Sequence, residues 1–215
     1  MTLAADTTAS LDGLQHIVLD DISWDLYEHL LREVSGSTLR VTYHRGSVEI
    51  MSPLPKHETW KKAVAGFIEA MAFELNVPIR RLGSTTFRLH EREAGLEPDE
   101  CYYVQNVAAV RGKQVIELPA DPPPDLALEI DIARRSISRE PIYAALGVPE
   151  LWRYDGRGLH VLKLMPQGRY EPQPASEVFP FLPVKELERF IVRFPHEDDT
   201  AIMRDYLNWV RTLKP

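Results

Sequence analysis

The sequence has a single cysteine, Cys101, and no apolar stretch long enough to cross a membrane. One cysteine excludes an internal disulfide and a zinc site built from several cysteines. The first residues lack both the basic start and the apolar centre of a signal peptide. We therefore expect a cytoplasmic protein that does not enter a membrane, with Cys101 as a small buried strand residue.

An excess of positive charge is also absent. The formal net charge of the 215 residues is −7, which argues against a protein that coats nucleic acid with a broad basic surface, although a local basic groove is compatible with it. With 44% hydrophobic residues, the chain has enough apolar content for one packed domain. We expect a poorly ordered segment over residues 1–20 and a single domain over residues 21–215 that ends in helices.

Three common catalytic motifs are missing from the sequence. It has no G-x-S-x-G turn of serine hydrolases, no glycine-rich phosphate loop and no H-E-x-x-H helix of zinc peptidases. The run "HERE" at residues 90–93 has no second histidine at zinc spacing. These absences argue against the three corresponding classes of enzyme.

The first part of the chain predicts a helix and a hairpin. Residues 21–34 carry apolar positions at helical spacing, with Asp21 or Ser23 as the N-terminal cap. Residues 39–52 alternate apolar and polar side chains on both sides of "HRG", which is typical of two antiparallel strands.

A long helix is expected next, over residues 56–76. Its apolar stripe extends to His57, so this side chain points inward near the positive end of the helix. Short strands within residues 79–89 and 99–106 follow, separated by the acidic, turn-like residues 90–98.

The second half of the chain predicts a strand over residues 126–132 and then a helix. Pro141 is tolerated only in the first turn of a helix, so Ser138 is the expected cap and Arg139 the first helical residue. Gly147 is expected to end this helix.

A second hairpin spans residues 149–164 across the turn "DGRG", and two helices follow over residues 184–191 and 198–212. This order of elements predicts a mixed α+β fold, with a central mixed β-sheet flanked by helices.

Acidic residues lie on one face of two of the predicted strands. The side chains that share a face are Asp99, Cys101 and Tyr103 on the first strand, and Ala127, Glu129 and Asp131 on the second. Burying a carboxylate without a partner is costly, so such positions bind a cation or a basic side chain. Ligands that are all oxygen favour Mg²⁺ or Mn²⁺ over zinc.

Three segments carry a resemblance to a known family: "GLEPDECYYV", "PDLALEIDI" and "SISREPIYAALGVPELWRYD". Together they resemble the Uma-two family, a bacterial group of restriction-endonuclease-like proteins in the PD-(D/E)XK nuclease superfamily. The resemblance runs from "RVTYHRGSVEIMSP" to "GRGLHVLKL", well over half of the chain. It implies a restriction-endonuclease-like core and a metal-dependent endonuclease that hydrolyses phosphodiester bonds of nucleic acid, with DNA as the expected substrate.

The resemblance also assigns residues. It implies that Asp99 and Glu129 are ligands of one Mg²⁺ or Mn²⁺ ion, with the backbone carbonyl of Ile130 as a third ligand. Asp131 stands where the superfamily's motif lysine is expected, and Arg139 falls where the family commonly moves its basic residue.

Arginine keeps its proton, so Arg139 can neutralise acids or hold a phosphate but cannot deprotonate water. The base is then a hydroxide generated by the metal or a nearby acid. His57 or Glu58 is a candidate to orient the water or to act as an outer ligand. Tyr143, one turn after Arg139 on the same helical side, is a further candidate or a core residue.

Other interpretations stay open for these residues. Asp99 and Glu129 can instead be partners of Arg134, Arg135 or Arg139 in a structural ion-pair cluster. Asp131 can be a turn former or a partner of Arg139.

At the level of function, the alternative is a catalytically degenerate nuclease fold that serves as a binding or scaffold protein, and a hydrolase of another phosphate ester is a third possibility. Asp125, four residues before Glu129 on the same strand, is assigned to structure. Trp152 and Tyr154 are assigned to the core, and a homodimer is expected only by analogy with other nucleases.

Overall fold

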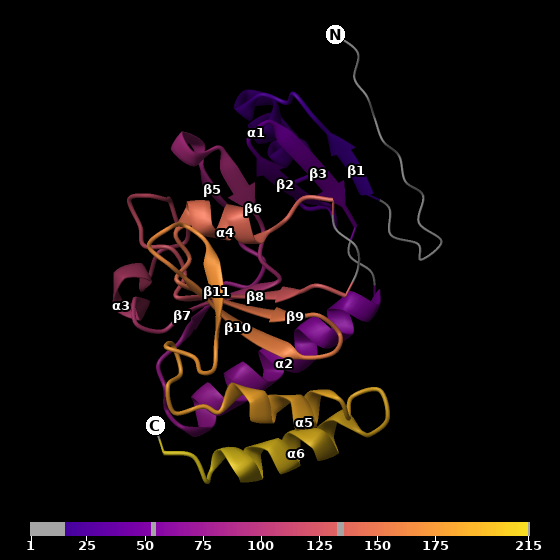
Figure 1. Ribbon diagram of the computed structural model, residues 1–215, viewed down its shortest axis with the longest axis vertical. Helices are drawn as coiled ribbons and strands as arrows, with labels where there is room; N and C mark the ends of the chain where they lie inside the picture. The colour runs from indigo at the N-terminus through magenta and orange to yellow at the C-terminus, as the bar shows by residue number, and fades with distance from the viewer. Residues whose placement is uncertain (1–15, 53–54, 133–135, 215) are drawn as a thin grey trace.

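Two β-sheets form the framework of the protein. The computed structural model describes residues 16–52, 55–132 and 136–214 (Figure 1). The first sheet is antiparallel, with strand order β1-β3-β2-β6-β5. Its strands are β1 (His16–Leu19), β2 (Arg40–His44), β3 (Ser47–Met51), β5 (Phe87–Leu89) and β6 (Ala94–Leu96).

The second sheet is mixed and has the order β11-β10-β9-β8-β7-β4. Its strands are β4 (Arg80–Arg81), β7 (Glu100–Tyr103), β8 (Leu126–Ile130), β9 (Glu150–Tyr154), β10 (Leu159–Leu164) and β11 (Tyr170–Gln173). Strands β8 and β9 are parallel and are joined through helix α4 (Glu140–Leu146), whereas the other neighbours are antiparallel. The expected fold class, a mixed sheet flanked by helices, is confirmed.

Helices cover both faces of the mixed sheet (Figure 1). Helix α4 lies on the side of the first sheet and contacts β5 and β6, while α2 (Pro55–Glu74) packs on the opposite side against β8. Helices α5 (Glu188–Ile191) and α6 (Asp199–Val210) pack against α2. The remaining helices are α1 (Trp24–Glu33), α3 (Val107–Val110) and the 3-10 helices η1 (His90–Arg92) and η2 (Val184–Leu187).

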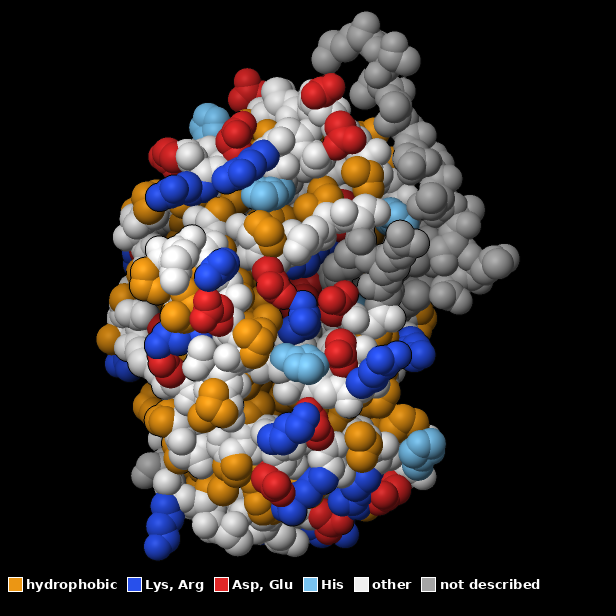
Figure 2. Space-filling view, viewed as in Figure 1, with side chains coloured by type: hydrophobic (Ala, Val, Ile, Leu, Met, Phe, Trp, Pro, Cys, Tyr) orange, Lys and Arg blue, Asp and Glu red, His pale blue; other side chains and the backbone are white. Residues whose placement is uncertain are grey.

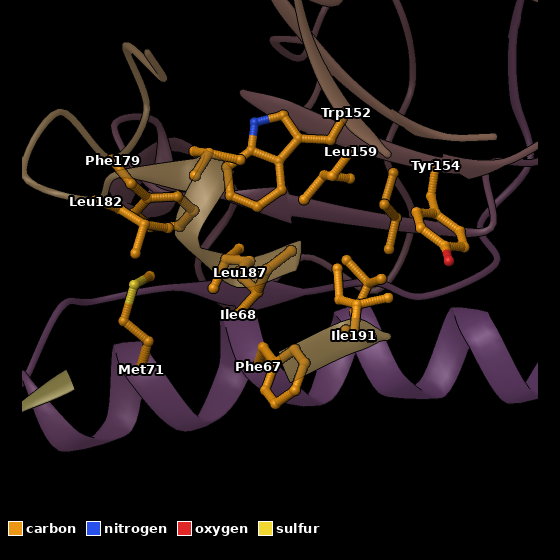
Figure 3. Close-up of a cluster of buried hydrophobic side chains, with 14 of the residues drawn as sticks. Phe67, Ile68, Met71, Trp152, Tyr154, Leu159, Phe179, Leu182, Leu187 and Ile191 are labelled. Carbon is orange, nitrogen blue, oxygen red and sulfur yellow. The ribbon is translucent and has the colours of Figure 1, made fainter. Parts of the chain in front are cut away.

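The main hydrophobic core lies between α2 and the mixed sheet (Figure 3). Ile68 and Met71 project from α2 toward the side of the mixed sheet, whereas the ring of Phe67 packs against Phe190 of α5 and Tyr206 of α6. The apolar stripe predicted along this helix is therefore confirmed.

Strand β8 is buried on both faces. Its even-numbered residues Leu126, Leu128 and Ile130 belong to the core on the α2 side, whereas Ala127 belongs to a second core beside α4. Glu129 therefore points toward α4 and the first sheet, away from α2.

Most local predictions agree with the structure. Ser23 caps α1, since its hydroxyl accepts a hydrogen bond from the amide of Leu26 at 3.3 Å. The hairpin of β2 and β3 turns at Arg45 and Gly46, both with positive φ. Gly147 ends α4 in the left-handed conformation, and Cys101 is buried in β7.

Two expectations about strands were wrong. The acidic residues 90–98 were expected to be a turn, but they contain η1 and β6, because Ala94, Gly95 and Leu96 are too few to show an alternating pattern. Strand 126–132 ends at Ile130, so Asp131 follows the strand.

Two other elements also differ from expectation. Strand β1 lies within the segment expected to be poorly ordered, whose residues 1–15 are outside the described part. The cap of α4 is Arg139 rather than Ser138, and it makes no side-chain cap hydrogen bond because a guanidinium has no acceptor atom; its side chain contacts Glu49 instead.

Among the described residues, no helix is both long enough and apolar enough to span a bilayer.

Two phenylalanines of α2 are expected to contribute very differently to the free energy of unfolding. Phe67 is fully buried, whereas Phe73 is 84% exposed. Phe67→Ala should lower the free energy of unfolding by about 3–5 kcal/mol, because it removes buried area and leaves a cavity. Phe73→Ala should change it by no more than about 0.5 kcal/mol. Urea denaturation of both variants measures the difference, and similar losses would contradict this assignment of the core.

Candidate active site

Two carboxylates meet where β7 and β8 run side by side. The antiparallel register pairs Glu100 with Leu128, and continuing it by one residue places Asp99 opposite Glu129. Residues paired in this way project from the same face of a sheet. The predicted convergence of these two acids is therefore consistent with the strand register.

Asp99 is completely buried and strongly hydrogen-bonded. Its Oδ1 accepts a hydrogen bond from the guanidinium of Arg40, at the start of β2. Its Oδ2 accepts one from the amide of Ile130 at 2.7 Å and lies 2.9 Å from Nε2 of His57. Because a carboxylate only accepts, Nε2 of His57 carries the proton in this contact.

Two side chains, one from α4 and one from its N-terminal cap, contact Glu129. The hydroxyl of Tyr143 donates a hydrogen bond to Oε2 of Glu129 at 2.5 Å, and Nε of Arg139 lies 4.0 Å from Oε1. Burial, followed by the charge of Glu129, raises the pKa of Tyr143 well above its usual value. Tyr143 therefore stays protonated and acts as a donor.

A third buried acid, Glu49, comes from β3 of the first sheet. Its Oε2 accepts a hydrogen bond from Arg139 at 2.9 Å, and its Oε1 accepts one from the amide of Ser136 at 3.0 Å. Glu49 and Arg40 were not among the site residues predicted from the sequence. The alternation of β2 and β3 shows that both lie on a polar face, and this face turns out to be directed toward the mixed sheet.

These five ionisable side chains are called the acid–arginine cluster: Glu49, Asp99, Glu129, Arg40 and Arg139. It contains three carboxylates and two guanidiniums. Burial alone would lower the pKa of Arg40, but the charge and hydrogen bond of Asp99, with the charges of Glu97 and Glu129, raise it overall. Charged groups from the two sheets therefore interact with one another within the cluster.

Two partly exposed acids lie next to the cluster beside Arg40 and form its rim. Nε of Arg40 lies 3.4 Å from Glu97 and its terminal nitrogen 3.7 Å from Glu58. Burial raises the pKa of Glu97, and the charges of Arg40 and Lys61 lower it in part. Lys61 contacts Glu58 and, at 3.6 Å, Glu100. Acids and cations therefore alternate along this rim.

The site residues predicted from the sequence differ in how near they lie to Asp99 and Glu129. His57, Arg139 and Tyr143 surround Asp99 and Glu129, and Glu58 lies at the rim. Nδ1 of His57 has no hydrogen-bond partner among the described residues and lies 3.8 Å from Glu58. Asp131 follows β8, and its amide donates to the carbonyl of Tyr154.

The structure also shows the surroundings of residues that were assigned a structural role from the sequence. Asp125 accepts hydrogen bonds from the amides of Val104 and Asn106, which agrees with a structural role. Trp152 and Tyr154 are in the core. Arg134 and Arg135, considered as partners of the acids, lie outside the described residues.

The cluster offers the right donor atoms for a divalent ion but not a ready-made set of ligands. Its acids provide oxygen, the donor that Mg²⁺ and Mn²⁺ prefer. Yet Arg40 already holds Oδ1 of Asp99. In the described part of the chain, no three His, Cys, Asp or Glu side chains are grouped so that they could hold a metal. The contact with Arg40 therefore occupies an oxygen that an ion at this site would need.

Comparisons with known proteins identify the family. A family model described as "Uma2: Putative restriction endonuclease" matches residues 24–192. A search of curated proteins gives no match. One similar solved structure is described as a "putative nuclease belonging to DUF820" from Anabaena variabilis ATCC 29413. It has 16% sequence identity, covers 78% of this chain and 90% of that chain, and gives a TM-score of 0.44. The family match spans most of the chain and the whole acid–arginine cluster, and the protein therefore belongs to the Uma2 family, the Uma-two family that its motifs resemble.

Proposed function

We propose that the protein is a metal-dependent endonuclease that hydrolyses phosphodiester bonds in nucleic acid, with DNA as the favoured substrate. The observation that carries this proposal is the opposition of Asp99 and Glu129 on neighbouring strands, in a chain of this family. In the view of Figure 2, Lys and Arg side chains are interspersed with Asp and Glu. This mixture favours substrate contacts confined to the site over a broad basic surface.

Asp99 and Glu129 would hold one Mg²⁺ or Mn²⁺ ion, with the carbonyl oxygen of Ile130 as a third ligand. Such an ion would supply Lewis-acid activation of water and of the scissile phosphate. His57 donates to Asp99 and orients its carboxylate. Glu58, whose side chain is 38% exposed at the rim, would orient an attacking water.

Arg139 has a charge-stabilising role in this proposal. It cannot accept a proton from water at ordinary pH. Its hydrogen bond to Glu49 fixes the guanidinium near Glu129, where its charge can oppose negative charge that develops on the phosphate. Tyr143 fixes the other oxygen of Glu129.

A second candidate function is a nuclease fold that binds a partner without catalysis. The observation that favours it is the pairing of Arg40 with Asp99 and of Arg139 with Glu49 in place of a motif lysine. Arginine pairs of this kind can serve structure alone. The two candidates differ in whether added metal produces cleavage.

The nuclease proposal predicts cleavage of labelled single-stranded, double-stranded or branched DNA with millimolar Mn²⁺. Asp99→Asn should lower cleavage to the background of a reaction without protein, because a neutral amide is a poor ligand for a hard cation. Glu177→Gln, which changes an exposed acid paired with Lys163, should leave cleavage intact and controls for contaminating nuclease. Absence of cleavage on all three substrates, or equal cleavage by Asp99→Asn, would favour the non-catalytic function.

The role of Glu49 predicts a large loss of stability when its charge is removed. Glu49→Gln should lower the free energy of unfolding by about 3–5 kcal/mol, because it breaks a buried ion pair and leaves Arg139 undercompensated. Glu177→Gln should cost at most about 1 kcal/mol, as is usual for an exposed pair. Equal losses in urea denaturation would show that Glu49 does not hold Arg139 in solution.

A homodimer is part of this proposal, since two copies can address the two strands of a duplex. Light scattering should then give a molar mass of twice 24.6 kDa at the concentration of the cleavage assay. A mass equal to one chain would remove the dimer from the proposal.

A further inference from the structure

We propose that Arg40 is an internal cation that competes with the divalent metal for Asp99, so that metal binding requires the guanidinium to leave this carboxylate. The inference rests on the proposed function, because it concerns the same metal site, and assigns Arg40 as a positioning residue within it.

The first support is burial. Asp99 is 0% exposed and the side chain of Arg40 is only 11% exposed. A carboxylate at such a position is stable only with strong hydrogen bonds or a positive partner. Arg40 supplies both through its contact with Oδ1. A metal ion bound at the same oxygen would lie close to the guanidinium, and the repulsion between the two positive charges disfavours their binding together.

The second support is that Arg40 has other partners when it leaves. Its guanidinium lies 3.4 Å from Glu97 and 3.7 Å from Glu58. The side chains of these acids are 23% and 38% exposed, so both lie nearer to solvent than Asp99. Arg40 can therefore move toward the rim without leaving its positive charge buried and unpaired.

The two arginines of the cluster differ in this respect. Arg139 is fixed by Glu49 and stands 4.0 Å from Glu129, so it does not take the near oxygen of a proposed ligand. Arg40 contacts a proposed ligand directly. Of these two arginines, Arg40 is thus the one whose contact competes with the metal.

The competition has a calculable effect on affinity. A ligand that binds only a minor state shows a dissociation constant raised by the inverse of that state's population. If Arg40 held Asp99 in about 99% of molecules, the apparent dissociation constant for metal would be about 100 times the intrinsic one. Removing Arg40 should abolish this penalty.

The test compares Mn²⁺ binding by wild type, Arg40→Gln, Lys61→Gln and Asp99→Asn. Free Mn²⁺ is measured by electron paramagnetic resonance and the binding constant by calorimetry, without nucleic acid. Lys61 is the matched control, since it is a cation of the same rim that contacts Glu58 and Glu100. Its loss changes the net charge by the same amount as the loss of Arg40.

Arg40→Gln should tighten Mn²⁺ binding by at least about tenfold, which corresponds to about 1.4 kcal/mol. Lys61→Gln should tighten it by less than about threefold, because screening weakens charge effects at the solvent-facing rim. Asp99→Asn should abolish binding. Equal gains in Arg40→Gln and Lys61→Gln, or no gain in Arg40→Gln, would overturn the proposal.

Removing Arg40 also leaves Asp99 without its guanidinium, so the variant can be unstable. The melting temperature of Arg40→Gln should then rise with Mn²⁺ more than that of wild type, because the ion replaces the lost positive charge. The double variant Arg40→Gln, Asp99→Asn should fold without Mn²⁺ and show no such rise. An equal rise in the double variant, or a single variant that stays unfolded with Mn²⁺, would contradict the exchange of cations.

This result is separate from the test of the enzyme. Tighter Mn²⁺ binding by Arg40→Gln, combined with no DNA cleavage by wild type, would support the competition and refute the nuclease. Cleavage by wild type with no gain in affinity in Arg40→Gln would support the nuclease and refute the competition.

Discussion

Negative charge buried between two sheets is the constraint on which this structure depends. Asp99 and Glu129 come from the mixed sheet, Glu49 comes from the first sheet, and all three are almost inaccessible to solvent. Acids in this environment need cations. Arg40 and Arg139 provide positive charge from β2 and from the start of α4, and they thereby tie the first sheet to the mixed sheet at one point.

The same interactions explain how a fold element becomes part of a site. Helix α4 joins the parallel strands β8 and β9, and in doing so it delivers Tyr143 to Glu129 and Arg139 to Glu49. Helix α2 packs its apolar stripe on the other side of the sheet, and its first turn delivers His57 to Asp99. Packing of the core therefore sets the positions of the groups to which we assign chemistry.

Sequence patterns predicted the parts of this arrangement that are local. The alternation along β8 predicted that Glu129 lies on the face opposite Leu128 and Ile130. The apolar stripe of α2 predicted that His57 points inward. The partners of these groups come from far along the chain. Glu49 and Arg40 lie on the polar face of a hairpin, and polarity alone does not distinguish a face turned to water from one turned to a second sheet. Strand β6 was missed for a different reason, since three small or apolar residues carry no period.

A crystal soaked in Mn²⁺ and examined by anomalous diffraction tests the central claim most directly, namely that a metal and Arg40 exchange at the carboxylate of Asp99. The account predicts an anomalous peak bound by Asp99 and Glu129, with the guanidinium of Arg40 moved to Glu97 or Glu58. A crystal without a peak, or one in which Arg40 still holds Oδ1 of Asp99 beside a bound ion, would contradict it.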